Sequence, residues 1–170
     1  SPVTEIEEND IVQLENGPEV RAFPTPHDVN GSVCYRIFNH DTGNSIAVMT
    51  DLGRMNDGMK GFARSSDVIL LESNYDPYML EHGEYPWPLK KRISGGHGHI
   101  SNPESAECAE FFINNGTKKF ILGHLSPHNN TPDIARETFT TLLADRGFVE
   151  GIDYEVKIAK KDMPSEGYVL

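Results

Sequence analysis

The sequence predicts a single layered domain of the α/β or α+β class, and three features of its 170 residues support that prediction. Strand-like segments come first, and strands that alternate with helices follow, an order typical of a sheet covered by helices. Two of the later segments carry clear helix start and stop signals. No internal repeat or linker divides the chain, and its length suits one domain with a substantial core.

The first half of the chain is predicted to be mostly strand. Residues 18–24 and 31–39 alternate as half-buried strands do, and "SIAVMTD" at 45–51 is a third apolar run. The turn-forming "NHDTGN" predicts a hairpin between the second and third of these strands. A short helix is expected within 52–66, and the continuous apolar run "DVILLES" at 67–73 predicts a buried strand.

The second half is predicted to alternate helices with strands. The expected elements are short helices within 76–83 and 85–96, a helix at 103–115, a strand at 118–125, a helix at 131–146 and a strand at 153–159. The helix at 103–115 has the strongest signals, because Ser101 or Asn102 can cap it, Pro103 lies in its first turn and Gly116 follows it. The tail at 160–170 is expected to be loose.

Composition and charge exclude some classes of protein. A formal net charge of −11 argues against a broad nucleic-acid footprint, because affinity for phosphate comes from clustered Lys and Arg. No apolar run approaches the roughly 20 residues of a membrane helix, so we expect no membrane partner, and we see no signal-peptide pattern. Cys34 and Cys108 are isolated, which predicts free buried thiols in a reducing compartment, the cytoplasm.

Three polar residues lie where predicted strands end. They are His27 after "EVRAF", Asp51 after "SIAVMT" and His124 after "KKFIL". Loops at strand ends supply many active-site residues, because a rigid sheet positions them. Two imidazoles and a carboxylate are typical ligands of zinc or manganese. Each residue taken singly is explained as well by a surface or capping role, so spacing alone does not define a metal site.

A second pair suggests acid–base chemistry. Glu72 ends the buried strand "DVILLE" and needs a partner, because an unpaired buried carboxylate is costly. His99, in "GGHGHISN", is a suitable partner, since it lies on a tight loop just before a helix start that favours anions. An imidazole oriented by Glu72 could protonate a leaving group. The alternative is that Glu72 is a structural acceptor and His99 an ordinary loop residue.

One short basic run stands out in this acidic chain. Lys90, Lys91 and Arg92 precede the Gly- and His-rich loop in "PLKKRISGGHGH". The three side chains either form a solvated helix face or line a phosphate-facing edge.

The short motifs resemble those of the metallo-β-lactamase superfamily. "TPHD" at 25–28, "TDLG" at 50–53 and "GHLS" at 123–126 are similar, in order, to the third, fourth and fifth metal motifs of that superfamily. "LLESNYDPYML", "YPWPLKKRI", "GHISN" and "HLSPHNN" resemble the bacterial YycJ (WalJ) group in particular. The resemblance runs from about residue 18 to residue 158, which is nearly the whole chain.

The resemblance implies a fold and a site. The fold would be one half of an αββα sandwich, a mixed sheet with the helices at 103–115 and 131–146 on its outer face. The site would be that of a two-metal hydrolase that uses zinc or manganese and a metal-activated water. His27 would bind the first metal, Asp51 would bridge both and His124 would bind the second. A similarity to the RNase Z branch supports His99 as general acid and Glu72 as the residue that orients it.

One expected motif is missing. The superfamily's first motif, H-x-H-x-D-H, is absent, and "HGHI" at 97–100 only partly matches it and lies in the wrong place in the order. The chain also begins with Ser1 rather than Met. We therefore expect residues 1–170 to be the C-terminal portion of a single domain in a longer protein. This portion alone would hold a partial or empty metal site, and either the N-terminal half or self-association would cover its exposed sheet.

Three functions are consistent with the sequence. The favoured one is a metal-dependent phosphodiesterase, an exonuclease acting on DNA ends. The first alternative is a hydrolase of the same superfamily with a small substrate, such as a lactone, a thioester or a cyclic phosphodiester. The second is a non-catalytic binding or regulatory domain. A basic track that leads to the metal site would favour the nuclease over the small-molecule hydrolase.

Overall fold

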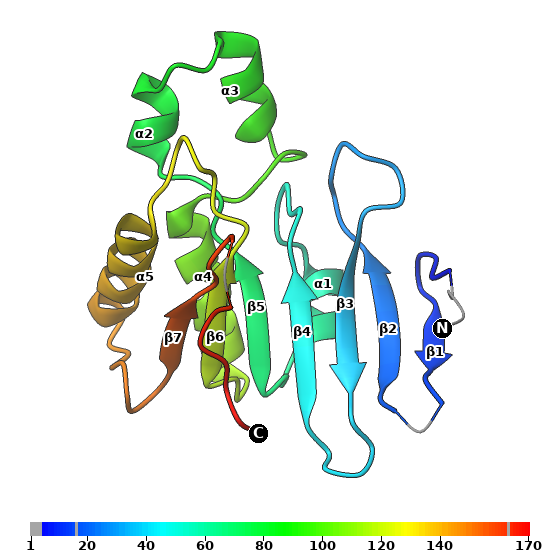
Figure 1. Ribbon diagram of the computed structural model, residues 1–170. Helices are drawn as coiled ribbons and strands as arrows, with labels where there is room; N and C mark the ends of the chain where they lie inside the picture. The colour runs from blue at the N-terminus through cyan, green and yellow to red at the C-terminus, as the bar shows by residue number, and fades with distance from the viewer. Residues whose placement is uncertain (1–4, 16, 163) are drawn as a thin grey trace.

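Seven strands form one sheet whose spatial order follows the chain order in the computed structural model, which describes residues 5–15, 17–162 and 164–170 (Figure 1). Ser1, at the start of the chain, lies outside the described residues. The strands are β1 (Ile11–Gln13), β2 (Glu19–Pro24), β3 (Val33–Phe38), β4 (Ser45–Met49), β5 (Val68–Glu72), β6 (Lys119–Gly123) and β7 (Glu155–Ile158). Neighbours from β1 to β4 are antiparallel and those from β4 to β7 are parallel. The predicted mixed sheet is confirmed.

Helices supply the crossovers between the parallel strands. They are α1 (Asp57–Ala63) between β4 and β5, then α2 (Pro77–His82), α3 (Trp87–Ile93) and α4 (Asn102–Asn114) between β5 and β6, and α5 (Pro132–Asp145) between β6 and β7. The two strongest helix predictions are confirmed within one or two residues at each end. Ser101 and Glu104 form a capping box at the start of α4, and the Thr131 hydroxyl caps α5.

One face of the sheet packs against α1, α4 and α5. Alternate strand residues point to this face, including Ala47, Met49, Ile69, Leu71, Phe120 and Leu122, all fully buried. They share one core with Met59 of α1, Phe112 of α4 and Phe139 of α5. This core fixes the parallel strands and therefore the positions of the loops at their carboxyl ends.

The opposite face of the sheet is apolar but only half-buried. Its residues include Tyr35, Ile37, Ile46, Val48, Leu70 and Ile121, which are paired across neighbouring strands. A half-buried apolar sheet face is the kind of surface that a second layer of structure covers.

The tail covers one end of this face, which shows that the expectation of a loose tail is wrong. The Tyr168 ring lies under the Nζ atoms of Lys119 and Lys157, at 5.6 and 4.3 Å, and its hydroxyl donates to the Phe120 carbonyl at 3.3 Å. Cation–π contacts of this kind hold an aromatic ring against a strand surface. In Figure 1 the tail runs in front of β6 and β7, on the side away from α4.

None of the helices in the described residues is both long and apolar enough to cross a membrane. Cys34 and Cys108 are free and buried, as the sequence predicts.

Candidate metal centre

Three of the candidate residues lie at the carboxyl ends of adjacent parallel strands. Asp51 follows β4 by two residues, Glu72 is the last residue of β5, and His124 comes directly after β6. His27 reaches the same edge from the loop after β2, and His99 reaches it from the loop before α4. The structure thus brings all five residues together.

The backbone is unusual at two of these positions. Asp51 has φ 56° and His124 has φ 57°, in the left-handed region that non-glycine residues rarely adopt. Such conformations persist where the surrounding structure enforces them, and they concentrate at functional sites. The two side chains meet at this edge of the sheet, where Asp51 Oδ1 lies 3.9 Å from His124 Nε2.

Gly53 allows the loops of the site to approach one another closely. A Cβ atom at Gly53 would lie 2.4 Å from the Pro26 carbonyl oxygen and 2.4 Å from the Cα of His97. The Gly53 N–H donates to the Pro26 carbonyl at 3.2 Å, and the Asp28 N–H donates to the His97 carbonyl at 2.9 Å. The loops that carry His27, Asp51 and His99 are therefore joined through backbone contacts that a larger residue would break.

Glu72 organises two of the imidazoles. Its side chain is fully buried, and its Oε1 accepts hydrogen bonds from Nδ1 of His99 at 2.7 Å and Nδ1 of His124 at 2.6 Å. Its Oε2 accepts the Leu52 N–H at 2.7 Å. Burial raises the pKa of Glu72, but the hydrogen bonds from His124 and His99 outweigh it, so the net pKa is lowered. Glu72 is thus a charged carboxylate with both oxygens engaged.

These contacts set the tautomers of the histidines. A carboxylate only accepts hydrogen bonds, so Nδ1 of His99 and Nδ1 of His124 carry hydrogen. Nδ1 of His27 lies 2.8 Å from the Gly98 carbonyl oxygen, another pure acceptor, and carries hydrogen as well. In the neutral imidazoles the Nε2 lone pairs are then free. Metal-binding histidines show the same arrangement, in which the second nitrogen donates to a carboxylate or a carbonyl.

The free nitrogens surround Asp51. Its Oδ1 lies 3.7 Å from Nε2 of His27 and 3.9 Å from Nε2 of His124. The His99 ring centre lies 5.2 Å from that of His27 and 5.1 Å from that of His124. Two ligands of one zinc ion, each at about 2.0–2.1 Å, lie roughly 3–4 Å apart. The donor set therefore fits a divalent metal without rearrangement of the backbone.

Ligand atoms of His27, Asp51 and His99 lie within 4.8 Å of one another, and so do those of Glu72, His99 and His124. In the second group, Glu72 already accepts hydrogen bonds from Nδ1 of His99 and from Nδ1 of His124. We therefore infer that Glu72 orients these two histidines and does not bind a metal itself. The hydrogen bond that His124 donates to Glu72 raises the pKa of His124, with Asp51 adding a smaller effect in the same direction.

Arg92 is separated from the two lysines of the basic run in the structure. Arg92 forms an ion pair with Asp28, next to the loop of His27. Lys90 donates to the Glu81 carbonyl at 2.7 Å, and both Lys90 and Lys91 line a separate cavity together with Trp87. Consecutive helix residues point in different directions, so the three do not form one continuous edge, and only Arg92 borders the site.

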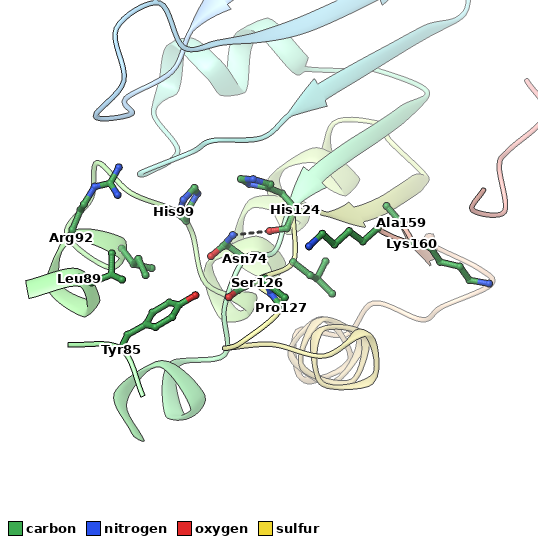
Figure 2. Close-up of a pocket in the computed structure, with 13 residues that line it drawn as sticks. Asn74, Tyr85, Leu89, Arg92, His99, His124, Ser126, Pro127, Ala159 and Lys160 are labelled. Carbon is green, nitrogen blue, oxygen red and sulfur yellow. Dashed lines mark hydrogen bonds between the residues drawn. The ribbon is translucent and has the colours of Figure 1, made fainter. Parts of the chain in front are cut away.

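A cavity of about 490 Å³ opens beside His99 and His124 (Figure 2). Its lining includes Arg92, which the sequence singles out, and also Tyr85, Lys160 and Lys161, which it does not. Lys160 and Lys161 are the first residues of the tail that the sequence predicts to be loose. Nothing local in the sequence indicates that residues 160 and 161 lie near His124.

The chain is similar to curated bacterial nucleases. It is 34% identical over 148 residues to exodeoxyribonuclease YycJ of Bacillus anthracis, covering 87% of this chain and 55% of that protein. It is 36% identical over 138 residues to exodeoxyribonuclease WalJ of Streptococcus pneumoniae serotype 2, covering 81% of this chain and 51% of that protein. The chain belongs to the YycJ/WalJ group of the metallo-β-lactamase superfamily. It spans about half the length of the curated relatives it matches. No family model matches the sequence.

Solved structures of metallo-β-lactamase-fold proteins share the fold. Zinc-bound PqqB from Methylobacterium extorquens aligns with a TM-score of 0.60 at 16% identity, over 91% of this chain and 48% of that one. A diphosphatase of the PhnP family aligns with a TM-score of 0.56 at 17% identity, over 95% and 48%. The human short form of tRNase Z aligns with a TM-score of 0.54 at 17% identity, over 90% and 44%. The predicted fold class is confirmed.

Proposed function

We propose that this chain forms the C-terminal part of a metal-dependent phosphodiesterase that acts as an exonuclease on DNA in the cytoplasm. The observation that carries the proposal is the set of three imidazoles with free Nε2 atoms around Asp51. The names of the curated relatives support DNA as the substrate. The buried free thiols support a reducing compartment.

In this proposal the complete site holds two divalent ions, zinc or manganese. His27 would hold the first, Asp51 would be shared by both and His124 would hold the second. Asp51 suits the bridging role because its Oδ1 lies at similar distances from the free nitrogens of His27 and His124. Bound ions of this kind supply Lewis acidity and a strong nucleophile at neutral pH.

His99 is proposed as the general acid for the leaving oxygen. Its Nδ1 is held by Glu72, which fixes the ring and leaves Nε2 free, and a ligand atom of His99 lies within 4.8 Å of those of His27 and Asp51. The cavity beside His99 gives a leaving group room to depart. Glu72 also holds His124, so a change at Glu72 disturbs one proposed metal ligand and the proposed acid together.

We further propose that residues 1–170 are one portion of a larger domain. The length of the curated relatives supports this, as does the half-buried apolar face formed by β3, β4, β5 and β6. The N-terminal portion would cover that face and supply the H-x-H-x-D-H ligands. Without it, the chain would bind metal weakly and self-associate through the open face.

A test needs the complete protein, a 5′-phosphorylated duplex and a metal determination on each variant. Asp51→Ala is expected to lose both bound metal and release of nucleotides from DNA ends. Asp145→Ala is the matched control, because Asp145 is exposed and lies at the end of α5, away from the site. The proposal is wrong if the metal-loaded protein releases no nucleotides from DNA, or if Asp51→Ala matches the control.

A further inference from the structure

The cavity beside His99 and His124 differs in charge from the rest of the molecule. Among its lining residues are three cations, Arg92, Lys160 and Lys161, and no Asp or Glu. Four other cavities in the described part of the chain each include at least one carboxylate side chain. The whole chain has 26 acidic and 15 basic residues. A cavity with only positive charge is therefore a local exception that favours an anionic ligand.

The backbone at Lys160 is held by the sheet and by the tail. The Ala159 N–H donates to the Leu122 carbonyl at 2.8 Å, which continues the pairing of β7 with β6. The Lys160 N–H donates to the Ser165 hydroxyl at 2.6 Å, and Tyr168 anchors the rest of the tail on the sheet. Arg92 is already paired with Asp28. Among the described residues neither lysine forms an ion pair, so both ammonium groups are free for a ligand.

The remaining walls suit a flat apolar group. Tyr85, Leu89 and Arg92 lie on one side of the cavity and Ala159 and Lys160 on the other, with His99, Asn74 and His124 between them (Figure 2). Tyr85 is half-buried, and its ring centre lies 5.6 Å from that of His128. Exposed aromatic faces beside cations are the elements with which proteins hold single-stranded nucleic acid.

We propose that this cavity seats the terminal nucleotide of one DNA strand in an unpaired form. The base packs against Tyr85 and Leu89, and Lys160 and Lys161 hold the adjacent phosphates. A volume of about 490 Å³ is in the range of sites for one small molecule. The cavity is therefore too small for a base pair, so the terminal nucleotide must separate from its partner strand before it enters. This inference rests on the proposed function, since it assigns the substrate contacts of the same site.

A binding assay without hydrolysis tests whether this cavity, here called the seat, holds the terminal nucleotide. The probe is fluorescein-labelled single-stranded dT8, with the label on an internal base and both ends free, measured by anisotropy in EDTA. Tyr85→Ala is expected to weaken binding about 5- to 150-fold, the range for loss of one stacked base. Tyr85→Phe should bind as the unmodified protein does. Tyr78→Ala is the control, because Tyr78 is 69% exposed and stacks on His82 outside the cavity.

The lysines have a separate readout. Lys160→Ala/Lys161→Ala should weaken binding and reduce the slope of log affinity against log salt by about 1.4, or about 0.7 for each phosphate contact on a single strand. Arg64→Ala/Lys118→Ala removes two exposed charges elsewhere and should leave that slope unchanged. A further dT8 probe with an abasic residue at one end should bind equally well to Tyr85→Ala and to the unmodified protein.

The outcomes separate this inference from the proposed function. If Tyr85→Ala and the lysine pair bind dT8 no differently from their controls, the seat is wrong, whether or not the protein hydrolyses DNA. If the affinity for dT8 is unchanged when an abasic residue is placed at one end, and also when it is placed at the other end, the base contact is wrong. If dT8 binding responds as expected while the metal-loaded protein hydrolyses no DNA, the seat stands and the proposed function falls.

Discussion

Replacement of Glu72 by glutamine gives the most informative single perturbation of the site. The substitution keeps the shape of the side chain but exchanges one acceptor oxygen for an NH2 donor. In the structure both oxygens of Glu72 face only N–H donors, two imidazoles on Oε1 and the Leu52 amide on Oε2. The NH2 group that the substitution introduces must therefore face at least one buried donor.

Two consequences follow, and each has a magnitude. A buried donor left without an acceptor costs about 1–3 kcal/mol, so the free energy of unfolding of the metal-free protein should fall by that amount. The imidazoles can avoid the clash by moving hydrogen from Nδ1 to Nε2, but an Nε2 that carries hydrogen cannot bind a metal. Loss of such orienting partners typically lowers metal affinity about 10- to 100-fold, and we expect Glu72→Gln to fall in that range.

Two assays on the same variant test this reasoning. Urea denaturation in EDTA gives the free energy of unfolding, and competition with a chromophoric chelator gives zinc affinity. Glu110→Gln is the control, since Glu110 forms an exposed ion pair with Arg146 that is worth at most about 1 kcal/mol. If Glu72→Gln equals the control in both stability and zinc affinity, Glu72 does not orient the histidines.

Three further predictions follow from the same geometry. His99→Ala should lower turnover about 10²- to 10⁴-fold. Elemental analysis should find that His99→Ala keeps its metal and that Asp51→Ala loses it. If both variants lose metal, His99 is a metal ligand instead. The thiols of Cys34 and Cys108, whose pKa values burial raises to about 12, should resist iodoacetamide at pH 8 until the protein is unfolded. In the metal-free protein the raised pKa of His124 adds stability that is complete below its ordinary value of 6.5 and is lost as pH rises through the raised value. Metal competes with that proton, so zinc affinity measured from pH 6 to 8 should increase with pH, and a flat profile would contradict the assignment of His124.

Local signals account for what the sequence predicts well. The helices α4 and α5 are recognisable because Ser101 and Thr131 cap them and a proline follows each cap, and none of these signals depends on distant residues. Asp51 and His124 are recognisable as candidates because each follows an apolar strand directly. Parallel pairing of adjacent strands then brings these ends to one edge of the sheet.

The parts that the sequence does not predict depend on long-range packing. Glu72 was expected to partner His99, but its bond to His124, 52 residues away, follows from the pairing of β5 with β6. Lys160 reaches the cavity because β7 pairs with β6 and the Ala159 N–H donates to the Leu122 carbonyl. Neither contact leaves a periodic or capping pattern in the chain. The separation of Lys90 and Lys91 from Arg92 is likewise set by how α3 lies against its neighbours.

Locating bound zinc decides whether the proposed metal centre exists. A crystal of the protein soaked in zinc, with anomalous diffraction data collected on both sides of the zinc absorption edge, locates the ion without assumptions about activity. We expect an anomalous peak bonded to Nε2 of His27 or His124 and to a carboxylate oxygen of Asp51, with Nδ1 of His124 still on Glu72. A strong zinc peak elsewhere with this edge of the sheet empty, or zinc bound through Nδ1 of His124, would contradict it.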